Sequence, residues 1–186
     1  MTKIEEAVLF ATRMHSGQKR KLTYAPYILH PMEAAVIVES MTSDEDLIIA
    51  ALLHDVIEDT DAKPEDIEMH FGKRVLSLVQ SETENKRREL PASATWQIRK
   101  EESLAELKES NIEVKVLWLA DKLSNVRSIA KEYLKNGDII FNVFNEKDKS
   151  KHEWYYRTIA DLLRPELGST LAFLEYERLV NLIFDK

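Results

Sequence analysis

The segment Ala51–Thr60 (ALLHDVIEDT) places titratable side chains inside an apolar stretch. Four of its residues can carry charge: His54, Asp55, Glu58 and Asp59. Residues four positions apart share a face of a helix, so the four side chains fall within an arc of roughly 140°. Such an arc is often a solvated face. Its apolar neighbours leave little room for one, however, and partly buried carboxylates are costly unless a partner compensates them.

Two further polar residues interrupt apolar surroundings. Asp121 follows the apolar run VKVLWLA, and His30 precedes a proline in the segment PYILHP. Taken alone, each is explained by helix capping, by a salt bridge or by packing. Together with His54 and Asp55, they make a set of two imidazoles and two carboxylates.

That set of side chains matches the ligands of a divalent metal ion. Nitrogen and oxygen ligands without sulfur suit Mn²⁺ or Fe²⁺, and suit Mg²⁺ less well. A metal ion lowers the pKa of the water that it holds, so that the water becomes a nucleophile at neutral pH. We therefore expect a hydrolytic metal centre built from four residues: His30, His54, Asp55 and Asp121.

Composition and charge restrict the class of protein. The 186 residues include no cysteine, and 44% are hydrophobic, so we expect one globular domain over residues 1–186 without disulfides. A net charge of −7 argues against nucleic-acid binding. No apolar run approaches the roughly 20 residues that span a bilayer, and the N-terminus lacks a signal-peptide core. We expect a cytoplasmic protein without membrane contact; the oligomeric state is left open.

Hydrophobic periodicity and the scarcity of Gly and Pro predict an all-α fold. The expected helices cover about Thr2–His15, Pro31–Met41, Ser43–Glu58, a short stretch after Pro64, Lys73–Ser81, Ser93–Glu109, Ile112–Lys135, His152–Leu163 and Ser169–Phe184. Thr2 is a candidate N-cap of the first helix, and either Ser43 or Asp44 caps the third. Pro165 and Gly168 are expected to separate the last two helices. The charged segment Glu82–Pro91 is predicted to be a mobile loop, and Asp138–Lys151 carries no clear pattern. Short connections join these elements into a bundle of about eight to ten helices, which must bring the four candidate ligands together.

The order of these motifs resembles a known family. The pattern H…HD…D is that of the HD domain. The strings HSGQKRK, PYILHP, AALLHDVIEDT, HFGKRVLSLV and LADKLSNVR occur in the order found in the hydrolase domain of RelA/SpoT-type alarmone enzymes and of the stand-alone Mesh family. The resemblance covers about residues 3–130. It implies an HD-domain helical bundle and, because the chain has no room for a synthetase domain, a free-standing hydrolase.

The resemblance implies an activity and a role for each matching residue. The family removes the 3′-pyrophosphate of ppGpp or pppGpp, giving GDP or GTP and pyrophosphate, and uses Mn²⁺. Here the four candidate ligands named above would hold the ion. Glu58 and Asp59 would activate or position the attacking water. Without the resemblance, the same two carboxylates are explained as solvated groups near a helix end.

The resemblance also implies contacts to the substrate. Five residues match family positions near the nucleotide: Lys19, Arg20, Lys21, Asn125 and Tyr156. A guanidinium can stack on a purine, and a lysine can meet phosphate. Each has an ordinary alternative. The three basic residues are also explained as a solvated loop, Asn125 as a surface amide and Tyr156 as a core residue. The roles of Lys122 and Arg127 are left open, and the three other histidines, His15, His70 and His152, match no ligand position.

The departures from the family pattern surround the substrate rather than the metal. They are the run TYAPYILHP, the residues around Thr83, which matches a threonine that the family has near the site, and the extension FNVFNEKDKSK. The nucleotide is therefore open: alternatives are the 2′-phosphate of NADPH, an adenosine alarmone or a nucleotide phosphomonoester. A non-catalytic nucleotide-binding module is an alternative from another class.

Overall fold

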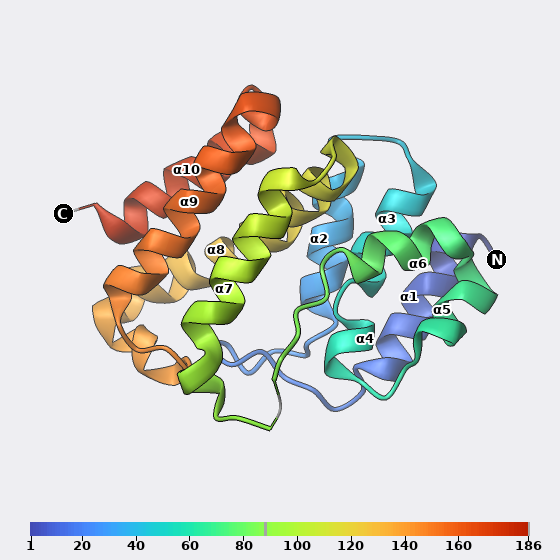
Figure 1. Ribbon diagram of the computed structural model, residues 1–186, viewed down its shortest axis with the longest axis horizontal. Coiled ribbons are helices and arrows are strands. Elements are labelled where there is room, and N and C mark those ends of the chain that lie inside the picture. Colours follow the sequence, from blue (N-terminus) through green and yellow to red (C-terminus); the bar gives the residue numbers. More distant parts are fainter. Residues whose placement is uncertain (88, 186) are drawn as a thin grey trace.

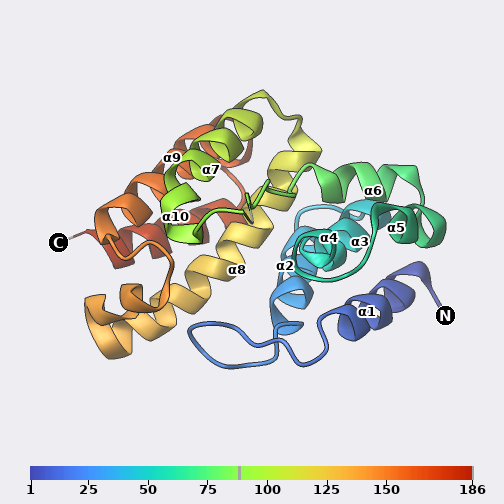
Figure 2. The same cartoon turned by 60° about the horizontal axis from the view of Figure 1, so that its bottom comes forward.

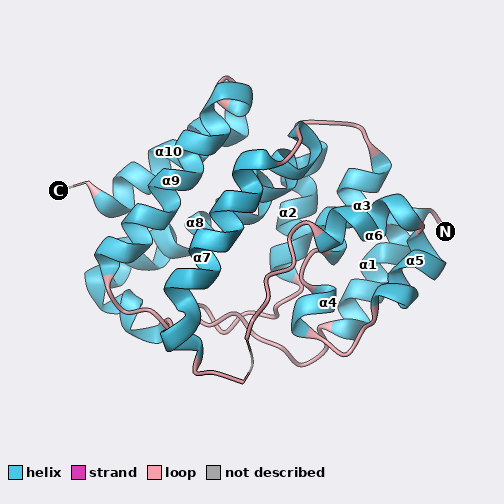
Figure 3. Cartoon of the chain, in the orientation of Figure 1, coloured by secondary structure: helices cyan, strands magenta, loops and turns pink. Residues whose placement is uncertain are grey.

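The computed structural model describes residues 1–87 and 89–185. Arg88, which belongs to the predicted loop, and Lys186 lie outside the described residues. Over the described part the chain forms ten α-helices, one 3₁₀ helix and no strand (Figure 1, Figure 3). The helices are α1 (Lys3–Met14), α2 (Leu29–Glu39), α3 (Glu45–Leu53), α4 (Val56–Asp59), α5 (Pro64–Phe71), α6 (Lys73–Gln80), α7 (Ala92–Glu109), α8 (Ile112–Asn136), η1 (Gly137–Val143), α9 (Lys149–Leu167) and α10 (Leu171–Phe184). The predicted all-α bundle is confirmed.

Helix α8 is the central element of the bundle. It packs against α2 and α10 and also contacts α3. Figure 2 shows α8 running between the group α1–α6 and the group α7, α9 and α10. Leu119, Leu123 and Val126 of α8 are fully buried, and Asp121 lies among them at 6% exposure. The helix therefore carries one carboxylate into the core.

Helix α3 is buried on every side. All its residues from Leu47 to Leu53 are buried, which explains why this stretch is apolar without a polar face. Asp44 accepts hydrogen bonds from the backbone N–H groups of Asp46 and Leu47 and so caps the helix, as one of the two predicted starts requires. The predicted cap at Thr2 is also present, as a capping box with Glu5.

The predicted helix from about Ser43 to Glu58 is wrong in its continuity. The chain turns at His54 and Asp55, so that α3 ends at Leu53 and the short helix α4 begins at Val56. Apolar periodicity runs through both pieces and gives no signal of the break. The break matters because the HD pair occupies the turn rather than a helix face.

The predicted end of a helix at Pro165 is also wrong. Helix α9 continues through Pro165 to Leu167. The proline removes one hydrogen bond to the carbonyl of Asp161, but both residues are exposed, so water can satisfy that carbonyl. The segment without a clear pattern begins with the 3₁₀ helix η1. No helix in the described part of the chain is long and apolar enough to cross a bilayer.

We expect the C-terminal helices to contribute to the free energy of unfolding through the shared core. Leu163 of α9 is fully buried, whereas Leu171 of α10 is 86% exposed. Leu163→Ala should lower the free energy of unfolding by about 2–5 kcal/mol, and the same substitution at Leu171 by about 0.5 kcal/mol or less. Urea denaturation measures both values. Equal effects of the two substitutions would contradict the packing described here.

Candidate metal centre and active site

Three helical regions bring the candidate ligands to one place. His30 lies in the first turn of α2, His54 and Asp55 form the turn between α3 and α4, and Asp121 lies in the middle of α8. One ligand atom from each of His30, His54 and Asp121 lies within 4.8 Å of the other two, and all three residues are buried. Residues some ninety positions apart therefore converge, as the sequence predicts.

The atoms that face one another can all act as hydrogen-bond acceptors. The Nε2 atoms of His30 and His54 are 3.2 Å apart. Asp121 Oδ1 lies 3.1 Å from His30 Nε2, and Asp55 Oδ2 lies 3.0 Å from His54 Nε2. Two imidazole nitrogens and two carboxylate oxygens at such distances repel unless a cation lies among them. The donor set, nitrogen and oxygen without sulfur, fits a divalent metal ion.

In the absence of a metal ion, a proton serves as that cation. Burial acts to lower the pKa of His54, but the Asp55 and Asp121 carboxylates raise it to about 10. Burial lowers the pKa of His30, against the effect of Asp121. The metal-free centre therefore holds one proton on His54 at neutral pH, and a metal ion must displace it.

Asp55 lies where the buried centre opens toward solvent. Its side chain is 18% exposed, and its Oδ2 atom accepts a hydrogen bond of 2.6 Å from the Tyr27 hydroxyl. Tyr27 also contacts Asp59 Oδ2, at 3.4 Å, and so links the HD turn to the end of α4. Apart from its place in the segment PYILHP, nothing in the sequence singles out Tyr27.

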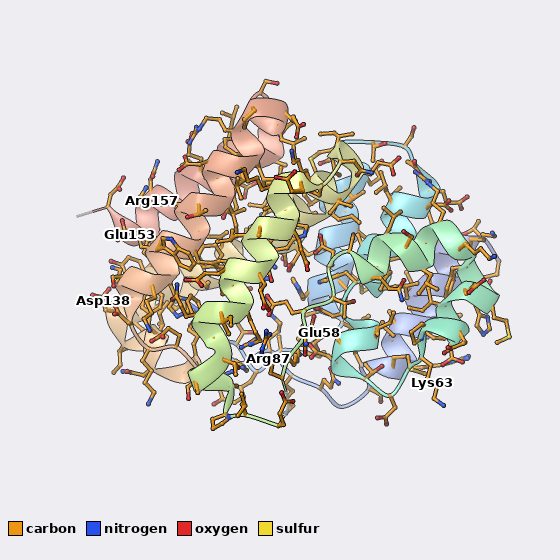
Figure 4. All side chains as sticks on the ribbon, viewed as in Figure 1. Glu58, Lys63, Arg87, Asp138, Glu153 and Arg157 are labelled. Carbon is orange, nitrogen blue, oxygen red and sulfur yellow. The ribbon has the colours of Figure 1, made fainter. Side chains whose placement is uncertain are left out.

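The Glu58–Asp59 pair is held by the segment between α6 and α7. In Figure 4, Glu58 lies beside this segment, and the backbone N–H of Glu84 donates to Glu58 Oε2 at 3.0 Å. Lys86 forms an ion pair with Glu58 Oε1 at 3.0 Å and a second one with Asp59. Burial raises the pKa of Glu58 although Lys86 opposes the shift. A carboxylate with a raised pKa is suited to take a proton near neutral pH.

Two adjoining cavities, each of about 530 Å³, surround these groups. The first, which we call the metal lobe, is lined by the four candidate ligands, by Glu58 and Asp59 and by several cations: Lys21, Lys86, Arg99, Lys100 and Lys122. The second, the basic lobe, is lined by Lys19, Arg20, Leu22, Ile129 and Tyr156 among others. Six residues line both lobes: Lys21, Tyr27, Asp59, Lys86, Asn125 and Phe144. The lobes together form one polar site with room for a nucleotide.

The predicted substrate residues lie around the basic lobe. Arg20 Nη2 donates to Asn125 Oδ1 and to Ser128 Oγ, each at 3.1 Å. Asn125 Nδ2 in turn donates to Asp121 Oδ1 at 2.7 Å, so the guanidinium is connected to the metal lobe. Tyr156 is a buried wall residue, and its ring stacks on that of Phe184. Lys19 and Lys21 are exposed at the rim.

Several lining residues escaped the sequence analysis. Lys86 lies in the predicted loop, and nothing in that charged stretch singles it out. Glu82 lines the metal lobe, and its Oε1 atom has no hydrogen-bond partner among the described residues. Burial, followed by the Asp121 charge, raises the pKa of Glu82 to about 8. Thr83, in contrast, lines neither lobe and donates to the carbonyl of Val79.

The structure gives defined contacts for Lys122 and Arg127, whose roles the sequence left open, and for the three other histidines. Lys122 lines the metal lobe, pairs with Asp121 and lies 4.7 Å from the centre of the Trp118 ring. Arg127 lines neither lobe and forms ion pairs with two glutamates. The other histidines have structural contacts: His15 with Gln18, His70 with Glu6, and His152 with the carbonyl of Glu146, although His152 also lines the metal lobe.

The pKa of His54 leads to an expectation for metal binding. Because this pKa is raised to about 10, the ring is protonated below that pH, and metal binding releases about one proton. The apparent affinity for Mn²⁺ should therefore rise about tenfold per pH unit between about pH 6 and 8. Titration calorimetry in buffers of different ionisation enthalpy measures the affinity and the proton release. An affinity independent of pH would contradict a metal-free centre that holds a proton on His54.

Comparisons with known proteins agree with this geometry. A model of the HD domain matches residues 7–144. MESH1 of Drosophila melanogaster, named a guanosine-3′,5′-bis(diphosphate) 3′-pyrophosphohydrolase, is 38% identical over 130 residues, which cover 68% of this chain and 69% of MESH1. A protein of the same enzyme name from Aquifex aeolicus is 38% identical over 126 residues, 68% of this chain but only 18% of its own length.

Solved structures share the fold. A metazoan orthologue of SpoT that hydrolyses ppGpp superimposes with a TM-score of 0.76 at 29% identity, covering 96% of this chain and 94% of that one. A crystal structure from Listeria monocytogenes gives 0.73 at 34% identity and covers 87% and 98% of the two chains. The family match spans the segment that supplies every candidate ligand, and the chain belongs to the HD domain family.

Proposed function

We propose that residues 1–186 form a single metal-dependent hydrolase domain that removes the 3′-pyrophosphate of ppGpp or pppGpp. The products would be GDP or GTP and pyrophosphate. One observation carries the proposal: four acceptor side chains converge next to a proton-accepting carboxylate pair, at the floor of a cavity lined by cations. The names of MESH1 and of the Aquifex relative support this substrate.

In this proposal His30, His54, Asp55 and Asp121 hold Mn²⁺, with Fe²⁺ as the alternative ion. The ion would lower the pKa of water and neutralise charge on the phosphate that is attacked. Asp55, at the open side of the centre, faces the cavity where the substrate would enter. Tyr27 donates to Asp55 and so fixes the carboxylate oxygen that is directed toward His54.

Glu58 and Asp59 act on the attacking water. Glu58, whose pKa is raised by burial, takes a proton from water, and Lys86 holds the pair of carboxylates in place. The water oxygen attacks the phosphorus that is bonded to the ribose 3′-oxygen. The bond from phosphorus to the 3′-oxygen breaks, and the 3′-oxygen leaves with the electron pair and is then protonated.

The basic lobe binds the nucleoside and its 5′-phosphates. Arg20 is positioned by Asn125 and Ser128, so its planar guanidinium is ordered before the substrate binds. Tyr156 adds an aromatic wall, and Lys19 and Lys21 supply positive charge at the rim. This local charge lets a protein of net charge −7 bind a polyanion.

Removal of a proposed metal ligand should abolish turnover. We expect Asp55→Ala to lower the rate of GDP and pyrophosphate formation from ppGpp by at least about 10³-fold, since the metal and the water both lose their position. Ion-exchange chromatography of reactions with Mn²⁺ measures the products. Asp61→Ala, at an exposed position six residues later, is the matched control and should be fully active.

Three outcomes would contradict the proposal. Unchanged turnover by a folded Asp55→Ala protein would exclude the proposed centre. No turnover of ppGpp by the unaltered protein, with release of phosphate from NADPH, would favour another nucleotide. Nucleotide binding without any product would favour the non-catalytic module.

The role of Glu58 is separable from metal binding. Glu58→Gln keeps the shape of the side chain but removes the proton acceptor, so kcat should fall by about 10²–10⁴-fold. The Kd for Mn²⁺ should stay within about threefold, because Glu58 is not a proposed ligand. Steady-state kinetics and calorimetry measure the two quantities, with Glu68→Gln on the exposed side of α5 as the control. A loss of metal binding equal to the loss of kcat would assign Glu58 to the metal instead.

A further inference from the structure

A chain of polar contacts leads from His30, away from the metal lobe, to the C-terminal helix. His30 Nδ1 lies 2.8 Å from Ser124 Oγ, and Ser124 Oγ donates to Glu33 Oε2 at 2.7 Å. Arg127 Nη1 donates to Glu33 Oε1 at 3.0 Å. Arg127 also holds Glu175 of α10 through two hydrogen bonds of 2.8 and 2.6 Å. We name Ser124, Glu33, Arg127 and Glu175 the His30 relay.

The chemistry of its members fixes the direction of the relay. A carboxylate only accepts hydrogen bonds and a guanidinium only donates them. Glu33 therefore accepts from Arg127 and from Ser124, and the single hydroxyl hydrogen of Ser124 is used. Ser124 must then accept from His30, so the ring hydrogen of His30 is on Nδ1. The bare Nε2 atom of His30 is thereby turned toward Asp121 and His54.

The second histidine is oriented by a different device. His54 Nδ1 donates to the backbone carbonyl of Ala51 at 2.8 Å. That partner belongs to α3 and cannot be removed by substituting a side chain. His30, in contrast, depends on side chains from its own helix α2 and from α8 and α10. The relay begins at Ser124, which is fully buried, and reaches Glu33 and Arg127, whose side chains are 36% and 34% exposed.

Helix geometry explains why these residues meet. Glu33 lies three positions after His30 on α2, and Arg127 lies three positions after Ser124 on α8. Residues three apart share a face of a helix, and α2 packs against α8. Two side chains of one face thus contact two side chains of the other. Glu175 enters from α10, which packs against the same helix α8.

We propose that Ser124 and Glu33 are positioning residues that set the tautomer and orientation of His30, and that α10 contributes to metal affinity through Arg127. The proposal rests on the proposed function in one respect, that a divalent ion binds at His30. Partners of metal-ligating histidines commonly change metal affinity by 10–100-fold when they are lost. The proposed function assigns Asp121 to the ion and Asn125 to the substrate, so α8 would carry these two residues as well as the positioning residue Ser124.

Glu33→Gln provides a test that keeps the size of the side chain. Arg127 needs an acceptor, so the amide oxygen faces Arg127 and the amide NH₂ faces Ser124. Ser124 then accepts from Gln and donates its own hydrogen to His30 Nδ1. The ring hydrogen of His30 moves to Nε2, where it blocks the metal. The isosteric substitution therefore reverses two hydrogen bonds, the one between residue 33 and Ser124 and the one between Ser124 and His30, while Arg127 remains a donor.

Two readouts follow this reversal. The Kd for Mn²⁺, measured by calorimetry, should rise 10–100-fold in Glu33→Gln. Nitrogen-15 NMR of the metal-free protein should show His30 changing from the Nδ1–H to the Nε2–H tautomer. The melting temperature of the metal-free protein should change by less than about 2 °C. Glu39→Gln, an exposed glutamate of the same helix, is the control and should change neither readout.

A double-substitution cycle tests the part of the relay that reaches α10. Glu175→Gln alone should weaken Mn²⁺ binding by about 2–5-fold, since Arg127 keeps its contact with Glu33 but loses a charged partner. In the double variant with Glu33→Gln, it should cause no further rise in the Kd for Mn²⁺, because the hydrogen bond between Ser124 and His30 is already reversed. Independent, multiplicative effects of the two substitutions would remove α10 from the relay.

The relay and the proposed function fail in different ways. If the unaltered protein binds Mn²⁺ and Glu33→Gln binds it equally well, the relay is wrong and the metal centre stands. If the unaltered protein binds no divalent ion, the proposed function is wrong, and the NMR tautomer still decides the relay. An Nδ1–H tautomer of His30 that persists in Glu33→Gln would overturn the reversal.

Discussion

The structure depends on the close approach of two imidazole nitrogens and two carboxylate oxygens in the core. The Nε2 atoms of His30 and His54 are 3.2 Å apart, with Asp121 and Asp55 oxygens about as close. Four acceptors are held together only if a cation lies among them and the backbone cannot relax. Rigid elements meet this condition: the start of α2, the turn after α3 and the centre of α8. The packing of these elements thus keeps four mutually repelling side chains in place.

Charge around the centre is arranged in alternation. The candidate ligands Asp55 and Asp121 and the Glu58–Asp59 pair line the metal lobe, and Lys86 and Lys122 lie directly against these carboxylates. Further out, Glu84 pairs with Arg99 and with Lys100. These cations are therefore not freely available to a phosphate, and a ligand there must compete with Glu84. Glu84 belongs to the segment between α6 and α7, which is one of the three places where the sequence departs from the family pattern.

Local signals in the sequence predicted much of the fold. Caps at Thr2 and Asp44 satisfy helix N-termini with side chains two or three residues away, and such short-range chemistry is visible in the chain itself. The break at His54 was invisible because apolar residues continue on both sides of it. The prediction that a helix ends near Pro165 failed for the opposite reason. A proline is a strong local signal for a helix end, but the hydrogen bond that it removes lies at an exposed surface, where water can replace it.

The site, like the fold, was predictable where single residues carry a local signal and not where only the folded chain brings residues together. His30, His54, Asp55 and Asp121 were chosen as candidate ligands because each is polar in an apolar segment, and the resemblance implies one metal site for all four. Lys86 and Glu82 were missed because a charged loop contains many equivalent residues, and only the folded chain selects among them. The partners of His30 were missed because they come together from separate helices, each at an ordinary helical position.

The central claim is that one divalent ion binds among the four acceptors. The most direct test is a crystal of the protein soaked in Mn²⁺, with anomalous scattering used to locate the metal. The account predicts one strong peak at bonding distance from His30 Nε2, His54 Nε2 and oxygens of Asp55 and Asp121. A well-ordered crystal with the four side chains turned apart and no peak between them would contradict it.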